Sequence, residues 1–248
     1  MLNNNLEYPQ KQIIDLHHER GGKSNLTAAA NSILAESKKS LYWDIFYSES
    51  DLKSQPPSQF AAFVASECSS FPLILDIGCG SGRDTVFFAN LGFATIAIDG
   101  SKSAVRQTIQ RFSKYAIGSD IHEFHCINAA DLPEADDLIY RISQTPKVIY
   151  SRFFLHAITD AEQASFFNFS YKCLSSDDVL ALEYRTTEDS HRQKVTNPHY
   201  RRYIDTQELI DNIQEKKEFR IEYCLSGTGL AKYKNDDAHV TRLLLRRE

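Results

Sequence analysis

A glycine-rich segment that follows a short apolar run constrains the fold of this 248-residue chain more than any other feature. Residues 73–84 read LILDIGCGSGRD, so a mostly apolar run leads directly into three closely spaced glycines. We read Leu73–Ile77 as a buried parallel strand, because the run is short, branched and bounded by Pro72 and the glycines. A helix predicted over Asp84–Leu91 follows and ends at Gly92. Such a turn brings backbone N–H groups and a helix N-terminus close to a ligand.

The spacing of the glycines separates two kinds of cofactor. A dinucleotide fold favours G-x-G-x-x-G, but here the third glycine comes early, at Gly82, and the sixth position is Arg83. Asp76 also precedes the first glycine. A carboxylate at that place disfavours a pyrophosphate and suits a cofactor that carries an ammonium and a sulfonium group.

Apolar runs and helical patterns alternate along the rest of the chain. We predict further strands over Ala94–Ile98, Glu123–Ile127, Lys147–Tyr150, Val179–Tyr184, Arg220–Cys224 and Val240–Leu245, and helices over Ser103–Tyr115, Ala161–Leu174 and Thr206–Lys216. The last two strands have no helix between them. The pattern predicts an α/β fold with a Rossmann-like, doubly wound, seven-stranded sheet, an antiparallel last strand and an N-terminal helical cap.

Charge and composition limit the classes of partner. The chain has 33 acidic and 28 basic residues, a formal net charge of −5, which disfavours binding to nucleic-acid phosphates and favours a small molecule. No run approaches the roughly 18 apolar residues that span a bilayer, and the N-terminus lacks a signal-peptide pattern, so we expect a cytoplasmic protein. The five cysteines are dispersed, which predicts neither disulfides nor a zinc site. Asp120, His122 and His125 alternate between strand faces, so we expect no metal.

The N-terminal quarter has its own organisation. Residues 1–24 are polar and read as a flexible leader, residues 25–70 as the helical cap, and residues 71–248 as the main domain, which contains the predicted sheet and the glycine segment. The cap contains the aromatic residues Trp43 and Tyr47 at near-helical spacing. They either cover a bound ligand or pack as plain core.

The glycine segment and the residues after three strands resemble the class I S-adenosylmethionine-dependent methyltransferases. The first motif of that family is an acid, one residue and G-x-G-x-G, and the resemblance covers roughly residues 42–248. It implies S-adenosylmethionine as methyl donor, Asp99 on the ribose hydroxyls, Ala130 and Asp131 beside the adenine, and Asp76 on the methionine end. The full set of expected cofactor contacts is Asp76, Gly78, Cys79, Gly80, Arg83, Asp99, Gly100, Ser101, Ala130, Asp131, Ser151, Trp43 and Tyr47.

Within that family the glycine segment, with Tyr-Trp-Asp upstream, is similar to methyltransferases of the thiopurine and tellurite-resistance type and of polysaccharide gene clusters. Nucleic-acid amino-methyltransferases carry Asn/Asp-Pro-Pro-aromatic after the fourth strand. This chain has Ser151-Arg152-Phe153-Phe154 there, which disfavours methylation of base amino groups.

Two groups of polar residues are candidates for the acceptor side. His156 is the candidate base, and the alternative is a structural histidine that caps the following turn; Arg152 contacts either the ligands or a nearby acid. After the fifth strand come the candidate substrate contacts Arg185, His199, Tyr200, Arg201 and Arg202. These arginines bind an anionic acceptor or pair with acids of the same loop.

We therefore expect an S-adenosylmethionine-dependent methyltransferase with a small polar acceptor that carries phosphate, carboxylate or sugar, methylated on oxygen. Nitrogen and sulfur acceptors stay open. The alternatives are a protein or nucleic-acid acceptor and a non-catalytic cofactor-binding module. The sequence leaves the oligomeric state open.

Overall fold

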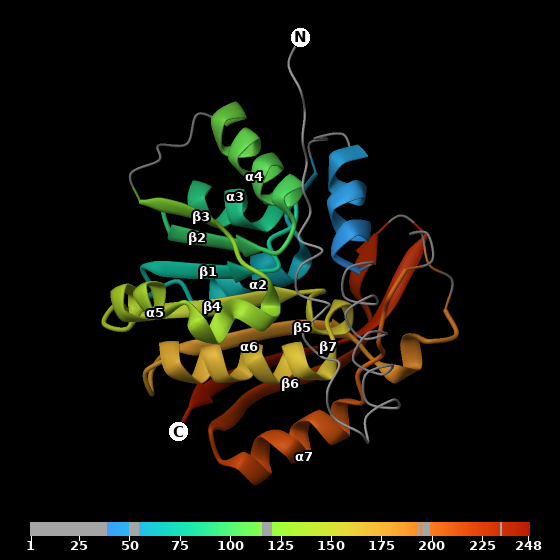
Figure 1. Ribbon diagram of the computed structural model, residues 1–248. Helices are drawn as coiled ribbons and strands as arrows, with labels where there is room; N and C mark the ends of the chain where they lie inside the picture. The colour runs from blue at the N-terminus through green and yellow to red at the C-terminus, as the bar shows by residue number, and fades with distance from the viewer. Residues whose placement is uncertain (1–38, 50–54, 116–120, 193, 195–198, 234) are drawn as a thin grey trace, which may run out of the picture. The chain divides into compact units, whose positions relative to one another are not determined.

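The computed structural model describes residues 39–49, 55–115, 121–192, 194, 199–233 and 235–248. The predicted leader, the first part of the predicted cap and Asp120 lie outside the described residues. The described part of the cap comprises a helix over residues 39–49, blue in Figure 1, and α2 (Gln59–Glu67). Ser58 caps α2, because its Oγ accepts from the N–H of Ala61.

The seven strands form a single sheet. They are β1 (Leu73–Ile77), β2 (Ala94–Asp99), β3 (His122–Cys126), β4 (Lys147–Arg152), β5 (Val179–Arg185), β6 (Phe219–Tyr233) and β7 (Asp236–Arg247). Their order is β3-β2-β1-β4-β5-β7-β6, and β7 runs antiparallel to both β5 and β6. This confirms the predicted fold class. The reversal between β1 and β4 is the place where an open α/β sheet forms a ligand crevice.

Helices cover both faces of the sheet (Figure 1). They are α3 (Arg83–Asn90), α4 (Lys102–Lys114), α5 (Asp136–Ile142), α6 (Asp160–Cys173) and α7 (Thr206–Lys216). Alternate residues of β1 explain the two layers: Leu73, Leu75 and Ile77 pack in one apolar cluster with α5, α6 and α7. Ile74 packs in the other cluster, with α2 and α3.

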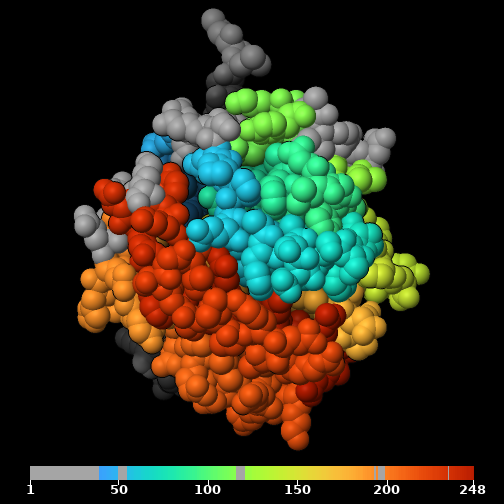
Figure 2. Space-filling model, turned by 180° about the vertical axis from the view of Figure 1, so that it is seen from behind, coloured from blue at the N-terminus to red at the C-terminus, as the bar shows by residue number. Residues whose placement is uncertain are grey.

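The C-terminal hairpin departs from the predicted boundaries. We predicted strands over Arg220–Cys224 and Val240–Leu245. In the structure β6 continues to Tyr233 and β7 already begins at Asp236, and the register of the pair is irregular near Gly227. The extension was missed because its glycines and charged residues break the apolar alternation. Figure 2 shows the broad outer surface of this hairpin beside α2, where Phe63 packs on Tyr223. The short helix α5 was also missed.

Candidate functional site

The turn from β1 into α3 is shaped by Gly78 and Gly80. Their φ angles are +77° and +55°, a left-handed conformation that favours glycine. A methyl group at Gly78 would lie 2.6 Å from the ring of Phe154, and one at Gly80 would lie 2.5 Å from Oη of Tyr47. Both conformation and space therefore require glycine here. The space beside these two glycines is filled by Phe154 and Tyr47.

Side chains of α4 hold the loop in place. Oγ1 of Thr108 donates to the carbonyl of Gly80 at 3.0 Å, and Nε of Arg111 donates to the carbonyl of Ser81 at 2.8 Å. Cys79 lies inside the loop, and burial raises the pKa of its thiol well above the usual value. Cys79 is therefore a packing residue in its neutral form.

Asp99 ends β2 beside this loop. Its Oδ2 accepts from the N–H of Gly80 and its Oδ1 from the N–H of Ser101, each at 2.9 Å. Each carboxylate oxygen keeps a second lone pair, so the group can accept from two neighbouring hydroxyls. Burial raises the pKa of Asp99 despite these bonds. The neighbouring Gly100 lies against Asn128, where a methyl group would meet Oδ1 at 3.0 Å.

Asp76 lies below the loop with only 2% of its surface exposed. Its Oδ2 accepts from Oγ1 of Thr85 at 2.6 Å. Burial, with Asp84 and Asp99 nearby, raises the pKa of Asp76 to about 7, although the Thr85 bond opposes the shift. An ammonium group brought to this carboxyl would oppose that shift, because an opposite charge favours the ionised form.

The remaining expected cofactor residues follow the edge of the sheet. Ala130 and Asp131 lie exposed on a 3-10 helix, Ala129–Glu134, beyond β3, where Nδ2 of Asn128 donates to Asp131 at 3.1 Å. Ser151 is buried, and its hydroxyl donates to the carbonyl of Ile77 at 3.0 Å, which joins β4 to β1.

Arg83 is engaged with its neighbour. Nε of Arg83 donates to Asp84 at 3.0 Å, and Asp84 also accepts from the N–H and Oγ of Ser58 and from Oη of Tyr150. The charges of Arg83 and Arg152, with the bonds from Arg83 and Ser58, keep the pKa of Asp84 low despite its burial. In this arrangement Arg83 serves the packing of α2 against α3.

The helix over residues 39–49 lies at the carboxyl edge of the sheet (Figure 1). The carboxylate of Asp44 accepts from Oγ of Ser101 and from the N–H of Ser103, each at 2.9 Å, so it caps α4. Trp43 and Tyr47 have ring centroids 6.1 Å apart. Tyr47 contacts the glycine loop directly at Gly80, and Trp43 packs on the ring of Tyr47.

Arg152 ends β4 with its charge compensated. Its Nε donates to Oε1 of Glu183 at 2.8 Å, and Nε of Arg242 donates to the other oxygen, also at 2.8 Å. Glu183 therefore lies between two arginines. The carboxylates of Glu183 and Asp84 raise the pKa of Arg152 against the effect of burial.

His156 lies in the turn after β4 with 5% of its surface exposed. Its Nδ1 accepts from the N–H of Arg185 at 3.2 Å, so in the neutral ring the proton is on Nε2. Burial, together with Arg185, Arg201, His199 and Arg152, lowers the pKa of His156 well below its usual value. The ring is neutral at physiological pH.

The candidate acceptor residues gather around this turn. The N–H of Arg202 donates to the carbonyl of His156 at 2.8 Å, and the Arg202 side chain binds Asp160, Gln163 and the carbonyl of Leu155. Arg185 is buried between Asp189 at 2.6 Å and Asp236 at 2.7 Å.

The loop from residue 199 to 203 completes this side. Nη2 of Arg201 lies 3.3 Å from Nε2 of His199, and Lys39 lies 5.9 Å above the ring of Tyr200. Tyr200 and His199 are thus both held against the helix over residues 39–49, since His199 stacks on Tyr42. The structure brings all five expected acceptor residues to the end of the sheet where β4 and β5 finish.

Phe153 was not among the expected site residues. It has a φ of +57°, rare for an aromatic residue, and its ring lies 4.1 Å from the Arg152 guanidinium and 5.1 Å from that of Arg185. The ring of His156 is 5.2 Å away. Strain of this kind clusters at functional sites, and the only hint in the sequence was its place directly after a strand end.

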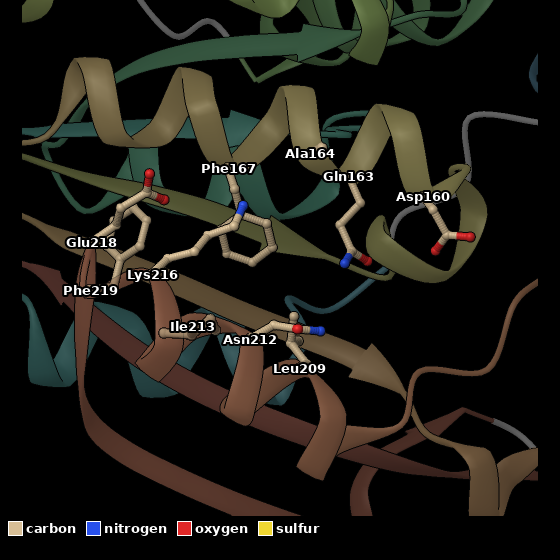
Figure 3. A pocket seen from close by; sticks show the side chains of 10 residues that line it. All are labelled: Asp160, Gln163, Ala164, Phe167, Leu209, Asn212, Ile213, Lys216, Glu218 and Phe219. Carbon is tan, nitrogen blue, oxygen red and sulfur yellow. The ribbon is translucent and has the colours of Figure 1, made fainter.

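A hollow lies between α6 and α7 (Figure 3). It has a volume of roughly 270 Å³, with Phe167, Leu209, Ile213 and Phe219 as its apolar lining. None of the expected site residues lines it. Asp160 and Gln163, at one end, bind Arg202.

Two features are absent from the described ranges. Within them, no three His, Cys, Asp or Glu side chains are grouped so as to hold a metal ion. Among the helices of the same ranges, none combines the length and apolarity that crossing a membrane requires.

Comparison with known proteins agrees with this geometry. Residues 74–177 match the family described as "Methyltransferase domain". No curated protein matches the chain in sequence. A solved S-adenosylmethionine-dependent methyltransferase from Anabaena variabilis has a TM-score of 0.61 and 18% identity, with 86% of this chain and 94% of that chain covered.

Two other solved structures share the fold. The glycopeptide N-methyltransferase MtfA has a TM-score of 0.59 and 11% identity, over 78% of this chain and 97% of that chain. The magnesium protoporphyrin IX methyltransferase from Synechocystis, solved with S-adenosylhomocysteine, has a TM-score of 0.53 and 15% identity, over 76% and 80%.

The strand order, the glycine loop and the acid at the end of β2 are those that the sequence motif led us to expect. Together with the methyltransferase domain matched over residues 74–177, they support a class I S-adenosylmethionine-dependent methyltransferase. Its cofactor is S-adenosylmethionine, which confirms the expectation from the motif. The residues present fit that cofactor, because Asp99 has lone pairs for two hydroxyls and the buried Asp76 lacks a cationic partner of its own among the described side chains.

Proposed function

We propose that the enzyme methylates an oxygen atom of a small polar acceptor that carries an anionic group, bound where β4 and β5 end. One observation carries the proposal: Arg152, Arg185, Arg201 and His199 lie near the buried His156, and their charges add to the effect of burial in lowering its pKa. Such a cluster of basic side chains in a protein with a net charge of −5 favours a small anion, although acids pair with Arg152 and Arg185.

Three arginines on the acceptor side are held by acids. Arg152 is paired with Glu183, Arg185 with Asp189 and Asp236, and Arg202 with Asp160. We assign a wall-forming role to these three. We assign recognition of the anionic group to Arg201, with Tyr200 beside it, because the charge of Arg201 acts on His156 and the N–H of the next residue, Arg202, donates to the His156 carbonyl. A guanidinium suits phosphate or carboxylate because it offers a planar pair of donors.

Methyl transfer to oxygen requires position more than covalent chemistry. The cofactor supplies an electrophilic methyl group on a sulfonium sulfur. The chain must align the acceptor oxygen with that methyl group, exclude water and take the hydroxyl proton. Phe153 and Phe154 supply apolar surface at the end of β4 for the first two tasks.

His156 remains our candidate for the proton. Its low pKa keeps the ring neutral, as a base must be. Because the N–H of Arg185 donates to Nδ1, Nε2 carries a proton and first meets the acceptor as a hydrogen-bond donor. Proton uptake therefore requires the ring to exchange tautomers, or a water molecule to accept the proton while His156 orients the acceptor.

The test is transfer of label from S-adenosylmethionine with a tritiated methyl group into a cell extract separated by size. We expect label in the small-molecule fraction, in a product that an anion exchanger retains, and at least tenfold less with Arg201→Ala. The exposed Arg220→Ala is the matched control. Label in protein or nucleic acid would contradict the proposal and support a macromolecular acceptor; cofactor binding without transfer would support a non-catalytic module.

A further inference from the structure

The helix over residues 39–49 contacts both halves of the crevice. On the cofactor side, Tyr47 lies against Gly80, and its carbonyl accepts from Nε2 of Gln107. On the acceptor side, Lys39 binds Glu162. One short helix thus connects the glycine loop to α6.

His199 is held by this helix. Its ring stacks on Tyr42 with centroids 4.7 Å apart and planes 14° from parallel. Trp43 makes an edge-on contact with the same ring at 5.0 Å. The two contacts therefore hold His199, and with it the adjoining residues 200–203, against the helix.

The ring contacts form one continuous path. Tyr47 stacks on Trp43 at 6.1 Å, and Trp43 meets His199. At the far end, Oη of Tyr47 is so close to Gly80 that even a methyl group there would collide with it. A ligand that approaches the main chain of Gly80 must therefore displace the Tyr47 side chain, and a displaced ring cannot move without its packed neighbours.

We propose that this helix transmits occupancy of the cofactor loop to the acceptor loop through the stacked ring of His199. Movement of Tyr47 away from Gly80 shifts Trp43 and Tyr42, and with them His199 and residues 199–203. His199 is then a positioning residue, which sets Tyr200 and Arg201 for the acceptor once the cofactor loop is filled. The coupling is reciprocal, so a bound acceptor strengthens cofactor binding by the same factor. The inference rests on the acceptor site proposed above.

The chain contains one tryptophan, Trp43, in the middle of this path. The experiment adds S-adenosylhomocysteine to the full-length protein and records Trp43 emission together with amide hydrogen exchange of residues 199–204. We expect the emission to change and the exchange rates of the loop to change at least threefold. No response of the loop in the wild-type protein, with the ligand bound, would overturn the coupling.

Tyr42→Leu removes the ring on which His199 stacks and leaves Gly80 and its neighbour Tyr47 in place. We expect the Kd of this variant for S-adenosylhomocysteine, measured by calorimetry, to lie within threefold of the wild-type value. The ligand-induced change in amide exchange of residues 199–204 should fall below a third of the wild-type change. Tyr42→Phe keeps the stacked ring and should restore the response. Tyr140→Leu, at a position 83% exposed on α5, is the matched control and should respond like the wild type.

The outcomes separate this inference from the proposed function. A full loop response in Tyr42→Leu would overturn the path while leaving the acceptor assignment intact. Labelled product in the protein fraction would overturn the acceptor assignment, whatever the exchange data show. A wild-type protein that binds no S-adenosylhomocysteine would overturn the coupling as well.

Discussion

At Asp76, protonation of the carboxyl group competes with cofactor binding. Its folded pKa of about 7 lies above its ordinary value of 3.8, so the folded state favours the protonated carboxyl. The stability from this group is complete below pH 3.8 and is lost as pH rises through 7. Cofactor binding has the opposite dependence, because the ammonium group requires the ionised carboxylate.

The first prediction concerns Asp76. Between pH 8 and pH 6 the Kd for S-adenosylmethionine should rise about tenfold in the wild type, since protonation then competes with binding. Asp76→Asn should bind S-adenosylmethionine weakly at both pH 6 and pH 8. Without cofactor at pH 8, its free energy of unfolding should exceed that of the wild type by about 2 kcal/mol. Calorimetry and urea denaturation measure the two effects. A wild-type Kd that is flat across this range would contradict the role of Asp76.

The second prediction separates the structural and chemical roles of His156. His156→Ala leaves the buried N–H of Arg185 without an acceptor and should lower the free energy of unfolding by about 2 kcal/mol. His156→Asn keeps an acceptor near Nδ1 and should lose less than about 1 kcal/mol, yet turnover should fall at least about a hundredfold in both. Full turnover in the asparagine variant would exclude His156 from the chemistry.

At this scale the motif predicted the chemistry of residues better than their contacts. Asp99 and the glycines follow from spacing, because strand, loop and helix are local in sequence. Phe154 over Gly78 and Tyr47 over Gly80 do not, since each joins segments that are far apart in the chain. The pairing of Arg185 with Asp236, 51 residues away, was equally beyond a local pattern.

The β6–β7 hairpin is the element that the sequence predicted least well. Its distal part is fastened to the crevice by the buried Asp236, which binds Arg185, and by the N–H of His239, which donates to Asp189. Phe153 packs on Ala231, Ala238 and Val240 of the same part. Chain folding thus places a wall beside the acceptor site from residues that carry no motif.

The third prediction tests that wall. Asp236→Asn removes one of the two carboxylates on the buried Arg185 and should lower the free energy of unfolding by about 2 kcal/mol, less than breaking an isolated buried pair. Amide exchange should accelerate first in the distal hairpin. Lys232→Gln, exposed on the same hairpin, is the control. Unchanged exchange in Asp236→Asn would show that the ion pair does not hold this element.

On the scale of the whole molecule, the sequence predicted the order of strands and helices better than the distribution of charge. The alternation of strands and helices predicted the sheet correctly, and the sheet order brings the ends of β1, β2, β4 and β5 together. The net charge of −5 did not predict the basic residues around His156, because composition carries no information about position. The predicted domain boundaries remain expectations.

The most direct measurement of the central claim is a calorimetric titration with S-adenosylhomocysteine. We predict one site per chain and a Kd at least about thirtyfold weaker in Asp99→Ala, which removes both acceptors for the ribose hydroxyls. Asp131→Ala, at the exposed adenine end, should weaken binding less. An absence of binding, or an affinity unchanged in Asp99→Ala, would contradict the assignment of the glycine loop and β2 as the cofactor site.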